Sequence, residues 1–306
     1  MNQITNFAYF GELSALLAAL CWSFAVIIFK SASKELSPLL ITTLKNTIAL
    51  ICFFIAFIVF DIPLWYSGFE NIDYIKIIIS GCLGMGIADI LFITALSKIG
   101  ANRVAIINCF EPAVVYFFSI LMLGTILTAP QFIGFIIVIM SILLISYEKD
   151  TSDIDPKLKK KGIIIQILAV IFSSFGIVLI KPVLSKTNDI IYIQLWVTVF
   201  RLFPGFVITW IIFLFQKNKL ILLEPLRKSK IIWQILISSG LGTFIALSFW
   251  ILGYANIEKP PIASIIGQTS TIFILILSYI ILKEKITQLR VIAILTACFG
   301  VMLIIM

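Results

Sequence analysis

The second half of this chain repeats the first at a fixed spacing. From Lys76 onward the two halves align without a gap at an offset of 158 residues, and upstream the offset shortens to 156 and then 151. The matches are Ser80 with Ser238, Leu83-Gly84 with Leu241-Gly242, Ala88 with Ala246, Phe92 with Trp250, Ala105 with Ala263, Lys45 with Arg201 and Lys30 with Lys181. The chain is therefore expected to contain two copies of one structural unit.

Each copy carries five apolar stretches long enough to span a membrane. Hydrophobic residues make up 61% of the chain and charged residues 12%, and a helix of about 20 apolar residues crosses the hydrocarbon core. The predicted spans cover residues 11–31, 38–60, 73–97, 101–124, 130–147, 162–183, 189–215, 231–254, 261–283 and 287–306. This pattern predicts an all-α polytopic membrane protein with a first repeat at 1–147, a basic linker loop at 148–161 and a second repeat at 162–306.

The number of spans in each copy determines how the copies are related. A five-span unit crosses the bilayer an odd number of times, so its second copy must enter from the opposite side. The two copies then form an inverted repeat about a pseudo-two-fold axis in the membrane plane, an architecture typical of secondary transporters. The expected fold is ten transmembrane helices in a 5+5 inverted repeat, which suits alternating access.

Basic residues are distributed unevenly between the loops. Of the 23 lysines and arginines, 17 lie in or beside the loops after spans one, three, five, seven and nine, and four lie on the other side. Loops rich in lysine and arginine stay in the cytoplasm, so both termini are predicted to be outside. The Ile-, Lys- and Asn-rich composition suggests a bacterial inner membrane. The net charge of +8 is thus explained by orientation, and no nucleic-acid partner is expected.

Several kinds of chemistry do not fit this composition. The chain has no histidine, which removes mechanisms that need an imidazole base. The five cysteines all fall within predicted spans, with neither Cys-x-x-Cys nor metal-ligand spacing. The glycine-rich segment 84–89 lies inside a span and matches no nucleotide-binding spacing. We therefore expect no enzyme activity, no cofactor and no metal.

Four ionisable residues lie well within the predicted spans: Lys45, Asp89, Glu111 and Arg201. A charge near the bilayer midplane costs roughly 2.5–3.5 kcal/mol on insertion scales, so it needs a partner or a wet cavity. One interpretation is a central cavity in which Lys45 and Arg201 are symmetry-related cationic contacts for the substrate. The other is two structural ion pairs that lock helices together. Asp89 lies at the depth of Lys45 and is its expected partner.

The fourth predicted span concentrates polar groups. Glu111 is the first candidate for a proton-coupling group and Asp89 the second, because a carboxylate in the membrane interior can take up and release a proton. Asn108 shares a helix face with Glu111, and Pro112 weakens the local helix hydrogen bonding. Gln268 stands at the equivalent place in the second repeat. The remaining candidate substrate-binding residues are Trp22, Ser23, Asn46, Trp250 and Tyr254.

Short motifs of the chain match a known family. They are Trp22-Ser23 in the first span, Lys45 in the second, Gly84 through Ala95-Leu96-Ser97-Lys98-Ile99-Gly100-Ala101 in the third, Glu111-Pro112 in the fourth and Leu282-Lys283-Glu284 in the ninth. Over essentially its whole length the chain resembles the EamA-type transporters of the drug/metabolite transporter superfamily. The Glu-Pro pair occurs only in the first half, and the acid of the final motif only in the second, so the expected site is asymmetric.

The resemblance implies a ten-helix inverted-repeat carrier for small metabolites such as amino acids, nucleotide derivatives or toxic compounds, working by exchange or with the proton gradient. The expected function is secondary transport of a small polar metabolite, amino-acid-like or nucleotide-like, or export of a toxic metabolite. An antiporter or uptake carrier for an anionic solute is the alternative, followed by a non-transporting receptor or scaffold. The expected partners are a small-molecule substrate, the lipid bilayer and protons, in a monomer or homodimer.

Overall fold

The computed structural model describes residues 9–146, 155–187, 190–217 and 219–282, together with seven positions between 292 and 303. Every regular element in these ranges is helical, in agreement with the predicted all-α class. Within them, the helices long and apolar enough to cross a membrane are Phe10–Ala32, Pro38–Val59, Asn71–Gly100, Pro156–Ser185, Ile191–Leu214 and Ser229–Asn256. The predicted tenth span, 287–306, lies outside the described residues apart from those seven positions, so the count of ten stays a prediction.

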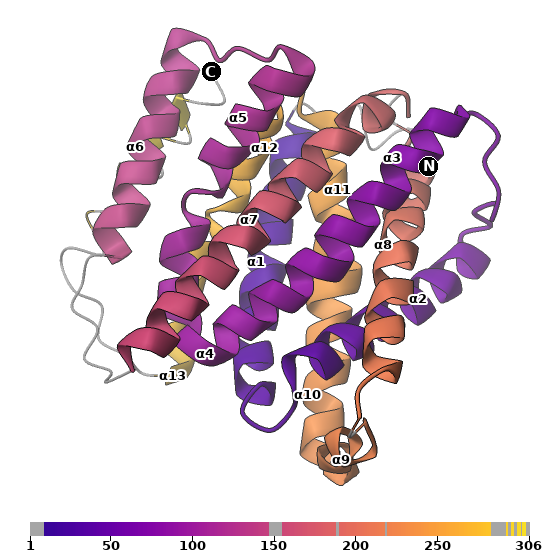
Figure 1. Cartoon of the computed structure of the whole chain (residues 1–306). Helices are drawn as coiled ribbons and strands as arrows, with labels where there is room; N and C mark the ends of the chain where they lie inside the picture. Colours follow the sequence, from indigo (N-terminus) through magenta and orange to yellow (C-terminus); the bar gives the residue numbers. More distant parts are fainter. Residues whose placement is uncertain are drawn as a thin grey trace.

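The helices of the two halves follow one another in the same order (Figure 1). The first half contains α1 (Phe10–Ala32), α2 (Pro38–Val59), α3 (Asn71–Ser80), η1 (Gly81–Ala88), α4 (Asp89–Asn108), α5 (Glu111–Leu123) and α6 (Ala129–Ser146). The second half contains α7 (Pro156–Ser185), α8 (Ile191–Leu214), α9 (Lys219–Leu223), η2 (Glu224–Arg227), α10 (Ser229–Ser239), η3 (Gly240–Ile245), α11 (Ala246–Asn256), α12 (Pro260–Gly267) and α13 (Ser270–Leu282).

The two halves also share their irregularities. The π-helical segments η1 and η3 occupy equivalent places in the third membrane-crossing helix of each half. In the first half α4 is kinked at Gly100, where φ is 79°, and the helix that starts after this kink is interrupted between Asn108 and Glu111. In the second half the helix after α11 is interrupted between Gly267 and Ser270. Shifting the first interruption by 158 residues places it within one residue of the second. The repeat seen in the sequence is therefore a repeat of the backbone, including its departures from regular α-helix.

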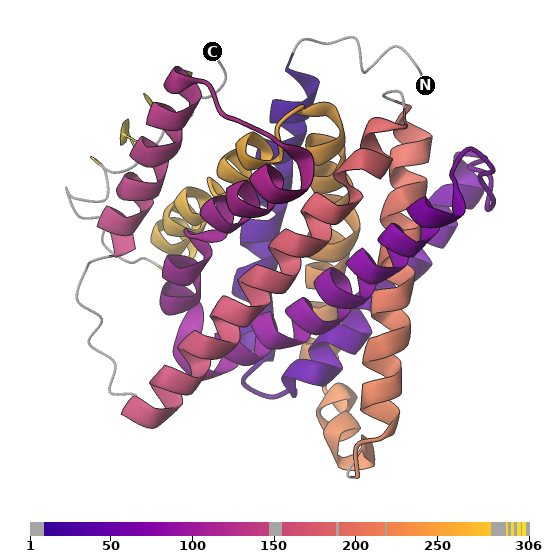
Figure 2. The ribbon, with the colours of Figure 1, turned by 45° about the horizontal axis from the view of Figure 1, so that its top comes forward.

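The halves run in opposite directions and exchange their first helices. In Figure 2, α1 descends from the upper side whereas α7 rises from the lower side. The helix α1 packs mainly against α10, η3, α11, α12 and α13 of the second half, and α7 packs mainly against α3, η1, α4 and α5 of the first. Each half thus depends on the other for its core, and the two first helices cross the centre of the molecule.

Two ion pairs fasten the exchanged helices at opposite ends of the molecule. Lys228 Nζ lies 2.5 Å from Glu35 Oε2, and Lys186 Nζ lies 2.8 Å from Asp73 Oδ2 and 3.8 Å from Glu70 Oε1. Lys186 follows Glu35 by 151 residues and Lys228 follows Glu70 by 158, so similar places in the two halves carry opposite charges, whereas the closer acid, Asp73, has Ile231 at an offset of 158. The hydrogen bond to Asp73 raises the pKa of the Lys186 ammonium. Each pair joins the loop after an exchanged helix to the start of the helix on which it packs.

Glycines allow α8 to pack closely on η1. A methyl group at Gly205 would lie 2.6 Å from Met85 Cβ, and one at Gly86 would overlap Ile208. Contacts this close between helix backbones need small residues, as is usual for helices packed in a membrane. These glycines therefore bring η1 and its neighbouring side chains against α8.

The predicted linker is shorter than expected. The helix α7 begins at Pro156, and the Asp155 side chain accepts a hydrogen bond of 3.1 Å from the Lys157 N–H. Proline is well suited to the first turn of a helix because its missing N–H would have no partner there. The segment 156–161 is therefore helical, and residues 147–154 lie outside the described residues. In Figure 2 this end of α7 lies on the same side as α9, as the predicted grouping of basic loops requires.

Lys181 of α7 caps the end of α11. Its ammonium donates hydrogen bonds of 2.7 Å to the Tyr254 carbonyl, 3.3 Å to that of Ala255 and 2.6 Å to that of Ile257. The last carbonyls of a helix have no partners within the helix, and a cation there also faces the negative end of the helix dipole. Lys181 thus holds the helix end that carries Tyr254.

Replacing Lys181 with methionine should lower the free energy of unfolding by about 1.5–3 kcal/mol, the usual contribution of a hydrogen-bonded charged donor. The reason is that three carbonyls at the end of α11 would lose their donor. Thermal unfolding of the purified protein in detergent measures the effect. Lys34→Met, at an exposed loop position, is the control and should unfold as the wild type does. Equal melting temperatures for the two variants would contradict the capping role.

Candidate functional site

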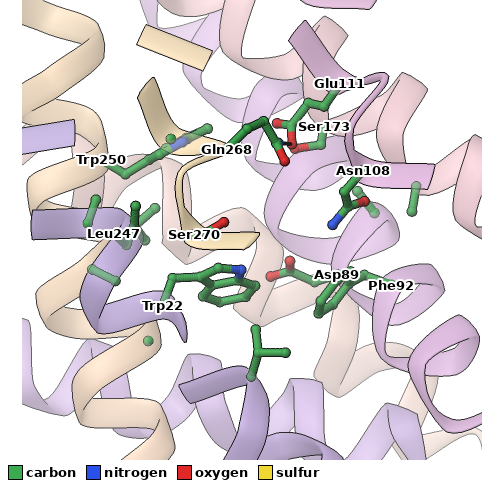
Figure 3. Close-up of a pocket in the computed structure, with 18 of the residues that line it drawn as sticks. Trp22, Asp89, Phe92, Asn108, Glu111, Ser173, Leu247, Trp250, Gln268 and Ser270 are labelled. Carbon is green, nitrogen blue, oxygen red and sulfur yellow. Dashed lines mark hydrogen bonds between the residues drawn. The ribbon is translucent and has the colours of Figure 1, made fainter. Parts of the chain in front are cut away.

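A cavity of about 190 Å³ lies between the two halves of the chain. A buried water occupies about 10–15 Å³ on this scale, so the cavity holds the equivalent of about a dozen waters, enough for a small metabolite. Its walls come from α1, α2, η1, α4, α5 and α7, and from η3, α11, α12 and α13. Figure 3 shows side chains from all sides pointing into one space. Both copies of the repeat therefore contribute to the same site.

Lys45 and Asp89 form an ion pair in the cavity wall. Lys45 Nζ lies 2.5 Å from Asp89 Oδ2, and the Lys45 side chain is 3% exposed whereas that of Asp89 is 15% exposed. Lys45 Nζ also donates to Asn46 Oδ1 at 3.1 Å. The predicted pairing of Lys45 with Asp89 is confirmed. The pair joins α2 to the start of α4 and leaves part of the Asp89 carboxylate facing the cavity.

Glu111 and Gln268 meet where the two broken helices face each other. Gln268 Nε2 donates to Glu111 Oε2 at 2.9 Å, and α5 packs against α12. Glu111-Pro112 begins α5 because proline cannot continue the preceding helix. Broken helices at the repeat interface are where transporters of this architecture place substrate and ion sites. In the part of the chain that the structure describes, no lysine or arginine forms an ion pair with Glu111.

Asn108 faces the cavity together with an amide from α7. Gln166 Nε2 donates to Asn108 Oδ1 at 2.6 Å, and both residues line the cavity. This bond crosses the interface between α4 and the exchanged helix α7. The Asn108 amide nitrogen lies on the cavity side with Phe92 and Asp89 (Figure 3).

Aromatic rings form the apolar part of the wall. Trp22 lies 5.6 Å from Phe92 between ring centroids, and Trp250 lies 4.7 Å from Tyr254 with the rings nearly perpendicular. All four residues line the cavity. Figure 3 places Trp250 on one side and Phe92 and Asn108 on the other. A ligand in this space would meet aromatic surface on two sides and carboxylate and amide oxygens between them.

Three candidate substrate contacts lie outside the cavity lining, which corrects the sequence-based expectation of direct contact. Ser23 Oγ donates to the carbonyls of Ala19 at 2.6 Å and Ser270 at 3.0 Å, which ties α1 to the break before α13. Asn46 Nδ2 donates to the Met85 carbonyl of η1 at 3.0 Å. Arg201 lies behind Trp250 and donates from Nε to Ser80 Oγ at 2.7 Å. Their polar atoms are directed at neighbouring helices.

The structure adds polar wall residues that the sequence reasoning did not name: Gln166, Thr243 and Ser264. Gln166 carried a usable signal, because an amide within a long apolar helix needs a partner just as a charge does. Thr243 and Ser264 carried none, because hydroxyl side chains are ordinary in membrane helices.

Membrane-spanning helices arranged as two repeats around a shared polar cavity define a multi-pass integral membrane protein of the transporter type. The model of the EamA-like transporter family matches residues 9–147 and again residues 160–306. The chain therefore belongs to this family, whose members are membrane transporters.

Comparison with solved structures supports the fold. One crystal structure of a protein aligns over 96% of this chain and 95% of its own chain, with a TM-score of 0.76 and 13% sequence identity. Likeness at this identity concerns the fold alone. No curated protein sequence matches this chain.

Proposed function

We propose that this protein is a secondary transporter that moves a small polar metabolite carrying an amino group, by alternating access of the cavity between Trp22, Asn108, Glu111 and Trp250 to the two sides of the membrane. The observation that carries the proposal is the charge of the cavity wall. The charge of Lys45 is matched by Asp89, and the Glu111 carboxylate faces Gln268 without a basic partner among the described residues. Among the described residues, the wall thus offers acidic oxygens to an incoming solute and no unmatched cation.

This charge distribution favours an amine over an anion as the group bound in the cavity. An ammonium near Asp89 or Glu111 would form a charge-assisted hydrogen bond in a site of low dielectric. An anion would meet the same carboxylates and be repelled. Trp22, Phe92 and Trp250 would contact the apolar part of the solute, and Trp250 or Trp22 could also face its ammonium. Amino-acid-like solutes and toxic amines fit this description better than nucleotide-like solutes.

Flux into sealed vesicles tests the proposal. Purified protein reconstituted into liposomes should take up labelled amines such as 3-methylbutylamine, or zwitterions such as leucine, above the level of protein-free vesicles. The anion 4-methylpentanoate, which has the same carbon skeleton, should enter more slowly. Uptake that favours the anion would instead support the carrier of anionic solutes. Binding without flux of any of the three would support the receptor alternative.

A further inference from the structure

Arg201 is a buried cation whose outer nitrogens have no hydrogen-bond partner among the described residues. The residue is 1% exposed, and Nε donates to Ser80 Oγ at 2.7 Å. Nη1 and Nη2 are buried and form no hydrogen bond within the described ranges 9–146, 155–187, 190–217 and 219–282. A guanidinium carries its charge at any physiological pH and needs acceptors for these N–H groups. The conformation of the structure therefore leaves unfilled binding capacity for an anion at this place.

The repeat explains why the acceptor is missing. Arg201 aligns with Lys45, and the partner of Lys45 is Asp89. The position that aligns with Asp89 in the second half is Leu247, which lines the cavity. The second half thus keeps the cation of the repeated unit but replaces its carboxylate with a leucine. An acceptor for Arg201 has to come from elsewhere.

The guanidinium packs against two glycines. A methyl group at Gly84 would lie 2.7 Å from Arg201 Nη2, and one at Gly176 would lie 3.7 Å from the same atom. Gly84 belongs to η1, whose next residue, Met85, lines the cavity. The outer nitrogens of Arg201 therefore lie next to the helix segment that borders the cavity.

Trp250 separates this guanidinium from the cavity. Arg201 Cζ lies 5.2 Å from the centroid of the Trp250 ring, and Trp250 lines the cavity whereas Arg201 does not. A cation over an aromatic face gains less than a cation paired with a carboxylate, which accepts two parallel hydrogen bonds from a guanidinium. A carboxylate that reached Arg201 would therefore compete well with the ring for this position.

We propose that Arg201 is an inner anion subsite, closed from the cavity by the indole of Trp250, and that it takes the carboxylate of a solute when the Trp250 ring rotates away. The inference rests on the proposed function, because it assigns a second contact to a solute held in the same cavity. Asp89 and Glu111 hold the amine end, and Arg201 holds an acid end where the solute has one. When a site is accessible only after a side chain moves, its apparent affinity equals the affinity of the open site multiplied by the fraction of molecules in which the site is open.

Binding of a matched pair of probes tests the subsite. The probes are 4-methylpentanoate and its uncharged isostere 4-methylpentanamide, and their Kd values are measured from the rise in Tm of the purified full-length protein in detergent. Trp250→Leu should bind the carboxylate about tenfold more tightly than the wild type while amide binding changes less than about twofold. Trp250→Phe introduces the residue that the first half carries at the aligned position, Phe92, and should show a smaller gain in carboxylate affinity. It replaces the leucine variant in the test if that variant does not fold.

The double variants identify the group that binds the carboxylate. The gain should disappear when Arg201→Gln is added to Trp250→Leu and remain when Arg201→Lys is added. In the wild-type background, where Trp250 covers the guanidinium, Arg201→Gln should change carboxylate binding by less than about twofold. An equal gain for both probes, a gain that survives Arg201→Gln, or no gain in either Trp250 variant would overturn the proposal. Uptake of 3-methylbutylamine by the wild type separates this failure from failure of the proposed function, because the amine does not need Arg201.

Discussion

Replacing Lys45 with methionine should lower the free energy of unfolding by about 3–5 kcal/mol, the cost of leaving one member of a buried ion pair without its partner. Lys45 Nζ lies 2.5 Å from Asp89 Oδ2, and the Lys45 side chain is 3% exposed. Without Lys45, the Asp89 carboxylate would be solvated only through its small exposed area in the cavity. Asp89→Leu should cost a similar amount because it leaves the more deeply buried lysine unpaired. Unfolding in mixed detergent or on heating measures both.

The double variant Lys45→Met with Asp89→Leu should recover most of the lost stability. It removes both charges, and leucine is the residue that the second half carries at the aligned position, Leu247. Replacing a whole buried ion pair with apolar residues is often neutral or stabilising. The double variant should be stable but should not transport. This result would separate the role of the ion pair in the site from its role in the fold. Single variants as stable as the wild type, or a double variant no better than either, would refute the coupling.

That Lys45 and Asp89 lie at one level was predictable from the sequence, but the direction in which Arg201 points around its helix was not. Lys45 and Asp89 lie at one depth, each needed a partner, and the structure pairs them. Arg201 was expected to face the cavity by symmetry with Lys45, yet it lies behind Trp250. Counting residues gives a height of 1.5 Å per residue, whereas the direction depends on how α8 packs against η1. That packing is set by glycines such as Gly205, whose contact partners the sequence does not name.

The membrane-spanning helices were predictable because long apolar runs leave few other structures for the chain. The predicted span 38–60 became α2 (Pro38–Val59), and 189–215 became α8 (Ile191–Leu214). The breaks within spans four and nine and the π-helical segments were missed. A π-helical turn leaves backbone groups that neighbouring side chains must satisfy, as Asn46 does for the Met85 carbonyl. Such pairing joins segments far apart in the sequence, so local patterns do not reveal it.

The site is asymmetric because equivalent places in the two halves carry different residues. Glu111 and Gln268 stand at nearly equivalent places, and the structure brings them within 2.9 Å of each other across the pseudo-two-fold axis. The sequence showed an acid in one half and an amide in the other. The sequence did not show that the two side chains would form a hydrogen bond, because that contact requires both broken helices to end at the same place.

We propose that Glu111 is the proton-coupling group, so neutralising it should uncouple transport from the proton gradient. In Glu111→Gln the side chain keeps its shape and can still accept the hydrogen bond from Gln268 Nε2, which is 2.9 Å long in the wild type, but it no longer takes up or releases a proton. Proton-driven accumulation of 3-methylbutylamine in proteoliposomes should therefore be lost. Exchange of labelled for unlabelled amine across vesicles without a gradient should continue, because it needs no net movement of protons.

Two control variants separate the carboxylate from its surroundings. Gln268→Leu removes the hydrogen-bond donor but keeps the acid, so accumulation should persist even where substrate affinity falls. Glu12→Gln neutralises a carboxylate at the start of α1, outside the cavity lining, and should behave as the wild type. If Glu111→Gln still accumulates the amine against its gradient, the proton binds elsewhere, and Asp89 becomes the residue to examine because its carboxylate is the other one open to the cavity. Loss of both accumulation and exchange would assign Glu111 to substrate binding, since a residue used only for the proton is not needed for exchange.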